Sequence, residues 1–295
     1  MDTCNPPDPC VSRAIAHVAA LSSGPALDRS LPVTLNFHPD RLHGGRLLLQ
    51  ALLDEGIYRS QFETGTSNGG LSAFEGGARW QWESRIFGGA YDGAAPALRP
   101  RYGALNFRRY PAGGSPRFGS AHLRLRPEIA VRCTFCYPDS VFEPTHFGVA
   151  DRIDLVARAL EDDKDVLDDY IEAHIHGPIR LATDVEALVL DPCCRGTPLE
   201  AVARRFPCAL EWHPGFRLAV EELRRHPDYR GQQFVDLGAA VAQDGWLDPF
   251  ILGRAAASGR HDPQDLKKVW HLIARFGGPM YAQMAPRSSH PKGPA

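Results

Sequence analysis

Histidine, glutamate, arginine and tyrosine side chains occur in four segments of this sequence that otherwise have the composition of β-strands. A charged side chain is costly to bury unless it is paired or used, so these positions are candidates for chemistry. A fixed carboxylate can stabilise a developing positive charge, and an imidazole can transfer a proton or bind a metal ion. A single His or Glu on a strand that faces solvent is also ordinary. The order and spacing of these residues along the chain are therefore more informative than any one of them. The residues concerned are His38, Arg41, Tyr102, Glu172, His174, His176 and Glu186.

The first half of the chain contains the elements that would position the first of these side chains. The β-branched and apolar run over residues 33–37 predicts a strand that ends at FHPDR. The segment GGRLLLQALLDEG has leucines at helical spacing, and Gly56 is a suitable helix stop. We expect further strands over 57–64, 103–108 and 122–125.

The second half of the chain places the two glutamates on separate strands. Apolar residues over 149–160 lie on one helical face. The segment YIEAHIHG alternates strictly, which puts Glu172, His174 and His176 on one face of a strand. VEALVLDP predicts a mostly apolar strand that Glu186 enters near its start. TPLE predicts a capped helix start, a last strand is expected over 209–212, and the chain then becomes largely helical.

The composition is that of an ordinary globular protein. The chain has 295 residues, of which 43% are hydrophobic and 23% charged, so it can bury a core. Its 33 basic and 35 acidic residues give a formal charge of −2, which argues against a dedicated nucleic-acid binder.

No apolar run is long enough to cross a bilayer, and the N-terminus MDTCNPPDPC lacks the basic and apolar regions of a secretion signal. We therefore expect no membrane association and a cytoplasmic location. Seven cysteines, an odd number, are expected to be reduced thiols. Cys133 and Cys136 form a CxxC, but no second CxxC follows at the spacing of a zinc ribbon.

The order of these motifs resembles the His-Tyr-Glu branch of the ADP-ribosyltransferase superfamily. The resemblance consists of a His that ends an early strand, a helix with a glycine stop, a Tyr on a later strand, and a Glu opening the apolar strand VEALVLDP. It covers roughly residues 33–212, and the nearest match to that superfamily's Ser-Thr-Ser signature is the GTS at 65–67. The chain also resembles an uncharacterised bacterial family of unknown function.

This resemblance implies roles for particular residues in NAD chemistry. His38 would contact NAD, Tyr102 would stack on nicotinamide, and Glu186 would be the catalytic glutamate, with Glu172 as the alternative. Breaking the nicotinamide-ribose bond develops positive charge on the ribose, which a fixed carboxylate stabilises. The activity would be that of an ADP-ribosyltransferase or an NAD glycohydrolase. The acceptor could be a protein, a nucleic acid, a small molecule or water.

Three further groups of side chains are candidates for holding NAD. Arg41 or Arg59 could neutralise the pyrophosphate, since guanidinium binds phosphate in a bidentate manner. The turn GTSNGG could line the cleft with Thr66 and Ser67.

The implied fold is α+β, with two small packed antiparallel sheets that form an NAD cleft and a helical C-terminal extension. In that interpretation residues 1–30 are an N-terminal arm and 31–215 the catalytic domain. Residues 216–283 would form the helical extension, and 284–295 a disordered tail.

A second interpretation is a metal-dependent hydrolase. His174 and His176 form an HxH whose two rings point to the same side of a strand. With Glu172, His146 and His213 they could build a metal centre. A non-enzymatic binding module is the third interpretation, and it does not need His, Glu and Arg clustered at strand ends. Metal content of the purified protein would distinguish the first two interpretations.

Overall fold

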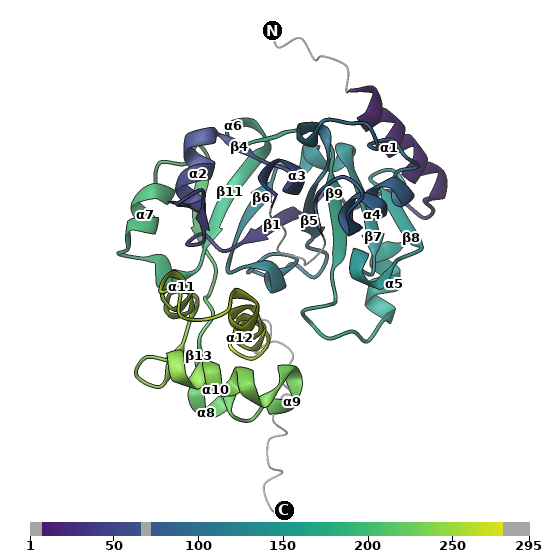
Figure 1. Cartoon of the computed structure of the whole chain (residues 1–295). Coiled ribbons are helices and arrows are strands. Elements are labelled where there is room, and N and C mark those ends of the chain that lie inside the picture. The colour runs from purple at the N-terminus through teal and green to yellow at the C-terminus, as the bar shows by residue number, and fades with distance from the viewer. Residues whose placement is uncertain (1–7, 66–71, 280–295) are drawn as a thin grey trace, which may run out of the picture.

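An eight-stranded mixed sheet runs through the centre of the molecule (Figure 1). The computed structural model describes residues 8–65 and 72–279. The strand order is β12-β11-β6-β1-β5-β9-β7-β8, and every neighbouring pair is antiparallel except β11 and β12. The strands are β1 (Val33–Phe37), β5 (Arg101–Leu105), β6 (Ala121–Leu125), β7 (Cys133–Tyr137), β8 (His146–Val149), β9 (Ile171–Ile175), β11 (Val185–Leu190) and β12 (Ala209–Trp212).

This sheet corrects the expected fold class, because the described residues do not form two small packed antiparallel sheets. Strand β1 pairs with a strand on each side. Leu35 of β1 pairs with Leu123 of β6, and Val33 of β1 pairs with Leu105 of β5. Strands on both sides of β1 therefore belong to one continuous ladder. The α+β character and the C-terminal helices are present, but a cleft between two sheets is not.

The helices of the described residues are α1 (Pro9–Leu21), α2 (Leu48–Glu55), α3 (Gln61–Thr64), α4 (Ala78–Ile86), α5 (Leu155–Glu161), α6 (Leu181–Asp184), α7 (Pro198–Ala203), α8 (Val220–Leu223), α9 (Pro227–Arg230), α10 (Gln232–Val241), α11 (Pro249–Ala257) and α12 (Pro263–Phe276). Short 3₁₀ helices are η1 (Pro96–Leu98), η2 (Pro116–Phe118), η3 (Pro127–Arg132), η4 (Ser140–Phe142) and η5 (Pro192–Cys194). Two-stranded ribbons pair β2 (Leu42–His43) with β3 (Arg46–Leu47), β4 (Ile57–Tyr58) with β10 (Ile179–Arg180), and β13 (Leu218–Ala219) with β14 (Trp246–Leu247).

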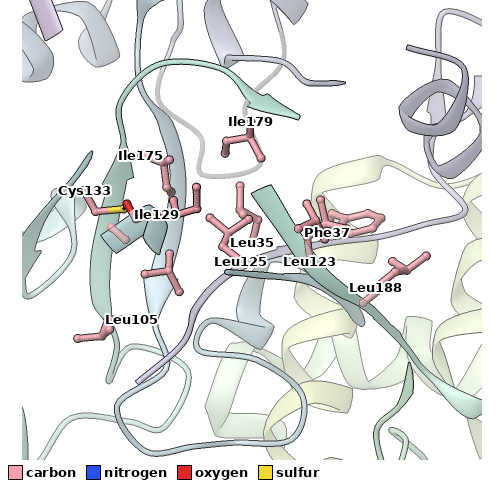
Figure 2. Packing of buried hydrophobic residues seen from close by; sticks show 14 of the residues in the cluster. Leu35, Phe37, Leu105, Leu123, Leu125, Ile129, Cys133, Ile175, Ile179 and Leu188 are labelled. Carbon is pink, nitrogen blue, oxygen red and sulfur yellow. The ribbon is translucent and has the colours of Figure 1, made fainter. Parts of the chain in front are cut away.

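One face of the large sheet is apolar and carries the main core. Leu35 of β1, Leu123 of β6 and Ile175 of β9 have no exposed surface, and Figure 2 shows side chains from these strands packed together. Helices α2, α5 and α7 contribute leucines and alanines to the same core. Because side chains alternate between the faces of a strand, the residues between these core positions must lie on the opposite face.

The opposite face is polar and is covered by α4 and by the segment that contains η2. Asn36 of β1 donates hydrogen bonds to the carbonyls of Ala112 and Gly119 and accepts one from the amide of Ser115. Thr34 of β1 accepts a hydrogen bond from the amide of Gly114. The sheet therefore has one apolar face and one polar face, and the candidate site residues on its strands lie on the polar face or at its rim.

The C-terminal helices form a second core beside the sheet (Figure 1). Its centre is α12, whose Val269 and Ile273 are fully buried. The indole of Trp270 donates to the carbonyls of Pro116 and Arg117, which attaches these helices to η2. A third core joins α1 to α4 and to the β7–β8 edge of the sheet. Among residues 8–65 and 72–279, no helix is long and apolar enough to span a membrane.

Several local expectations were wrong. The helix expected over 149–160 starts only at Leu155, because Val149 ends β8, and the strand expected over 103–108 ends at Leu105. The strand expected over 57–64 ends at Tyr58, because Ser60 and Glu63 form a capping box that starts α3. The TPLE segment does begin a helix, but Thr197 donates to the carbonyl of Cys194 instead of capping the helix. By contrast, α2 ends at Gly56 in the left-handed conformation, as predicted. The expected tail at 284–295 lies outside the described residues.

Candidate active site

The structure places the candidate residues in three separate regions. His38 and Arg41 follow β1 and line a cavity against α11 and α12. Tyr102 and Glu172 line a narrow cavity on the polar face of the sheet. Glu186 lies in a third, open depression near the β12 edge. The NAD-contacting set implied by the resemblance is therefore not brought together, although Tyr102 and Glu172 are.

Two other groups of candidates lie away from these cavities. Arg59 is on the surface, where it donates to Glu55 at 2.7 Å and lies 3.6 Å from Glu63. Thr66 and Ser67 fall outside the described residues. The ordinary explanation of a surface charge is sufficient for Arg59.

Strand pairing brings Tyr102 and Glu172 into the same cavity. Strand β5 pairs with β9 so that Tyr102 is opposite His174 and Ala104 is opposite Glu172. All of these side chains lie on the polar face of the sheet. The cavity has a volume of about 60 Å³. Its aromatic lining residues are Tyr58, Tyr102, Phe118 and Tyr170.

Glu172 is a buried carboxylate with several partners. It is 6% exposed. One oxygen accepts from the backbone amide and the hydroxyl of Ser140, at 3.3 and 3.0 Å. The other lies 3.1 Å from Nε2 of His174 and 3.8 Å from the guanidinium of Arg79. Burial by itself raises the pKa of Glu172, but the His174 hydrogen bond and the Arg79 charge outweigh burial and leave its pKa below the ordinary value.

A hydrogen-bonded chain of side chains ends at Glu172. Tyr91 and Nδ1 of His176 are 2.8 Å apart, and Oγ1 of Thr134 lies 3.0 Å from both Nε2 of His176 and Nδ1 of His174. If Nε2 of His174 donates to Glu172, one assignment satisfies every group: Thr134 donates to His174, His176 donates to Thr134, and Tyr91 donates to His176. Burial lowers the pKa of His176 well below its ordinary value, which agrees with a neutral ring. The chain fixes the orientation of His174 toward the carboxylate.

Tyr102 belongs to a second charged group next to Glu172. Its hydroxyl donates to Glu83 at 2.7 Å, and Arg99 donates to the other oxygen of Glu83 at 2.7 Å. Burial raises the pKa of Glu83 to about 7, although these hydrogen bonds oppose the rise. The guanidinium of Arg79 lies 4.1 Å from the centre of the Tyr102 ring. Arg79 therefore covers one face of the Tyr102 ring, and a ligand could stack only on the opposite face.

The set of metal ligands suggested by the sequence is divided. Both nitrogens of His176 are occupied within the hydrogen-bonded chain, and His146 lies exposed at the start of β8. His213 contacts the carbonyl of Ser120 and the amide of Gly215. Of the expected ligands, His174 and Glu172 remain in contact with each other.

A different third ligand completes a compact group. Sγ of Cys136, a carboxylate oxygen of Glu172 and a nitrogen of His174 lie within 4.8 Å of one another. The thiol is 3.8 Å from Nε2 of His174. Burial raises the pKa of Cys136 well above its ordinary value, so without a metal ion the thiol is protonated. This donor set, one thiolate, one carboxylate and one imidazole, suits zinc.

Glu186 has a different environment. It occupies an irregular position of β11, where the pairing register with β6 shifts between Val185 and Ala187. Its side chain is 47% exposed and bonds Arg124 at 3.0 Å. Arg124 also makes two hydrogen bonds to Glu211, at 2.8 and 2.6 Å. Glu186 is thus part of a surface ion-pair network, with water able to screen its charge.

The sequence analysis missed several residues of the site. Arg79 and Glu83 lie four apart in ARWQWESRI, a spacing typical of an exposed helical ion pair, yet both are buried. Cys136 was considered only as half of a CxxC motif, although the strand period places Thr134 and Cys136 on one face of β7. Ser140 follows the strand in a 3₁₀ turn and carried no signal.

The fold and the site define an α+β protein with one large mixed sheet that holds a buried charged cluster on its polar face. Residues 32–164 and 161–276 match a family described as a protein of unknown function (DUF3626). The chain belongs to that family. Among curated proteins none matches it.

Proposed function

We propose that this protein is an NAD-consuming enzyme, an ADP-ribosyltransferase or NAD glycohydrolase, and that Glu172 is its catalytic carboxylate. One observation carries the proposal: Glu172 is 6% exposed, yet its neighbours lower its pKa, and it faces a cavity with aromatic walls. A negative charge held in place before the reaction and shielded from water stabilises a developing cation far better than a solvated one does.

The reaction follows from that charge. The bond between C1′ of the ribose and the nicotinamide nitrogen breaks, and its electron pair leaves with nicotinamide, which becomes neutral. Positive charge develops on the ribose, where the carboxylate of Glu172 stabilises it. The oxygen of water, or an oxygen or nitrogen of another acceptor, then bonds to C1′ and loses its proton.

The neighbours of Glu172 are positioning residues in this proposal. His174 and Ser140 hold the two carboxylate oxygens, and Arg79 keeps the carboxylate ionised. The cavity of about 60 Å³ is much smaller than the roughly 300 Å³ or more of typical ligand pockets. The proposal therefore places only the reacting end of NAD there. Gln61 of α3 also lines this cavity.

The test is nicotinamide release from NAD by the wild-type protein, Glu172→Gln and Glu186→Gln. We expect Glu172→Gln to lower the rate by about 100-fold or more, as removal of a transition-state contact does elsewhere. Glu186→Gln is the matched control, because it removes a solvated carboxylate, and its rate should stay within about threefold of the wild type. Loss of release in Glu186→Gln but not in Glu172→Gln would contradict the proposal. Release should also be insensitive to chelators.

The second candidate is a metal-dependent hydrolase, and the compact group of Cys136, Glu172 and His174 supports it. Zinc binds such ligands at about 2.0–2.3 Å, so its ligand atoms must lie close together. Here the three ligand atoms lie within 4.8 Å of one another. The test is zinc content of the purified full chain. The hydrolase predicts one zinc per chain, lost in Cys136→Ser and kept in Cys133→Ser, whose thiol is on the opposite face of β7. A wild-type protein without zinc would exclude this candidate.

A further inference from the structure

A second cavity lies between the end of β1 and the C-terminal helices. Its volume is about 290 Å³, near the lower end of the range for small-molecule sites. The segment that follows β1 forms one wall, and α11 and α12 form the other. Figure 1 shows these two helices beside the sheet. This cavity does not include Tyr102 or Glu172.

The charged residues that line this cavity are mainly cationic. Arg41 comes from the segment after β1 and Lys267 from α12, while Asp40 is the single acidic residue in the lining. Burial and the nearby charges of Arg117, Lys268 and Arg41 lower the pKa of Lys267. The lining therefore carries two basic side chains against one acidic one, and this excess of positive charge attracts an anion.

Apolar side chains also line the cavity. Leu252, Leu266 and Trp270 line it. Trp270 is fixed by its hydrogen bonds to η2 and by an edge contact with His38, whose ring centre is 4.8 Å away. Burial lowers the pKa of His38 well below its ordinary value, so this imidazole adds no charge. The apolar wall thus combines a fixed indole with two leucines, as is usual where a flat or hydrophobic group binds.

The glycine in α11 keeps the two walls close while leaving the cavity open. A Cβ at Gly253 would lie 1.5 Å from Oδ2 of Asp40. Any larger residue would therefore displace Asp40 from its place against the helix. The next lining residues of α11, Ala256 and Ala257, are small and exposed. Small side chains along this helix leave room at the mouth of the cavity.

We propose that this cavity binds a small organic anion. Its charged head, a carboxylate, phosphate or sulfonate, contacts Arg41 and Lys267, and its apolar part lies against Leu252, Leu266 and Trp270. The site goes beyond the proposed NAD chemistry and does not depend on it, because the two cavities share no lining residue. The basic residues suit a charged head, and the leucine and tryptophan wall suits an apolar body.

Isothermal titration calorimetry with benzenesulfonate tests the proposal on the full chain. Benzyl alcohol is the uncharged comparison, and benzoate and phenyl phosphate show which head group binds best. We expect saturable binding of at least one anion with a dissociation constant below about 10 mM, and binding of benzyl alcohol at least tenfold weaker. No saturable binding of any of the three anions would overturn the proposal.

Two variants locate the binding. Lys267→Gln removes one cationic contact and should weaken anion binding about tenfold, whereas Arg254→Gln, an exposed arginine of α11 outside the lining, should change it less than twofold. Ala256→Leu fills the mouth and should weaken the alcohol and the anion together. Because Ala256 is exposed, this variant should fold. Equal affinity in the wild type, Lys267→Gln and Ala256→Leu would overturn the proposal.

Discussion

Glu172 keeps its charge in a buried position because both of its carboxylate oxygens have partners, while the side chain still lines the cavity. Ser140 and His174 provide hydrogen bonds, and Arg79 provides an opposite charge. His174 in turn is oriented by Thr134, which connects it to His176. In metal and active sites, the residues that orient a functional group often matter nearly as much as the group itself.

Thr134→Val is the change that interrupts this hydrogen-bonded chain with little change of volume. It leaves Nδ1 of His174 and Nε2 of His176 without a partner in a buried place, which costs about 1–3 kcal/mol of unfolding free energy. We expect nicotinamide release to fall about 10-fold while the apparent affinity for NAD changes little, because the variant disturbs orientation and not binding. Urea unfolding and steady-state kinetics measure both. Thr134→Ser, which keeps the hydroxyl, should recover most of the rate, and equal losses in both variants would contradict this role.

Asp40 gives a prediction for pH. Burial raises its pKa from 3.8 to about 6, against the opposing charge of Arg41. Lys267 of α12 and the neutral His38 also line the surrounding cavity. Since the folded pKa lies above the unfolded one, the folded state binds the proton more tightly, and this contribution to stability is lost as pH rises from about 4 to about 6.

Asp40→Asn should therefore become more stable relative to the wild type between pH 4 and pH 7, by up to about 3 kcal/mol. Thermal or urea unfolding at the two pH values measures the difference. Asp163→Asn, at an exposed position, is the matched control and should show no such trend. A relative stability of Asp40→Asn that is flat or falls with pH would contradict the burial of this carboxylate.

The sequence could predict which residues of one strand share a face, but not which residues of other elements meet them. Strict alternation placed Glu172 and His174 together correctly. Arg79 and Glu83, by contrast, have the spacing of a solvated helical pair, and only the position of α4 over the sheet buries them. Glu186 was favoured because it opens an apolar strand, yet exposure and Arg124 make it a surface charge.

At the scale of elements, local signals were sufficient where a helix begins and ends by its own chemistry. Helix α12 starts after Asp262, whose carboxylate accepts hydrogen bonds from the amides of Gln264 and Asp265, and it ends at Gly277. Both ends have a local signal in the sequence, Asp262 followed by Pro263 at the start and Gly277 at the stop. Strand order depends on contacts far apart in the chain, such as that between β1 and β6, so the single large sheet could not be read from short motifs.

Asp262→Ala should remove the cap of α12 and cost about 1 kcal/mol of unfolding free energy. The helix carries Trp270 and Lys267, so anion binding in the second cavity should weaken as well. Urea unfolding measures the cost. Gln264→Ala, an exposed change in the same first turn, is the control, and an equal loss in both variants would mean that the cap contributes nothing.

At the scale of the whole molecule, one short segment connects the sheet to the C-terminal helices. Ser115 and Phe118 line the Glu172 cavity, while the carbonyls of Pro116 and Arg117 hold Trp270 of the second cavity. The two cavities are thus neighbours across η2, although their residues come from distant parts of the chain. The family match over residues 161–276 includes strands β9, β11 and β12 of the sheet as well as the C-terminal helices.

In the proposed reaction, Glu172 stabilises the transition state of nicotinamide release. This role is tested by measuring kcat and the NAD dissociation constant for the wild type and Glu172→Gln, with Glu186→Gln and circular dichroism as controls. We expect kcat to fall by about 100-fold or more while the dissociation constant changes less than about threefold, because the carboxylate acts on charge that exists only in the transition state. A folded Glu172→Gln protein that retains the wild-type kcat would show that Glu172 has no such role.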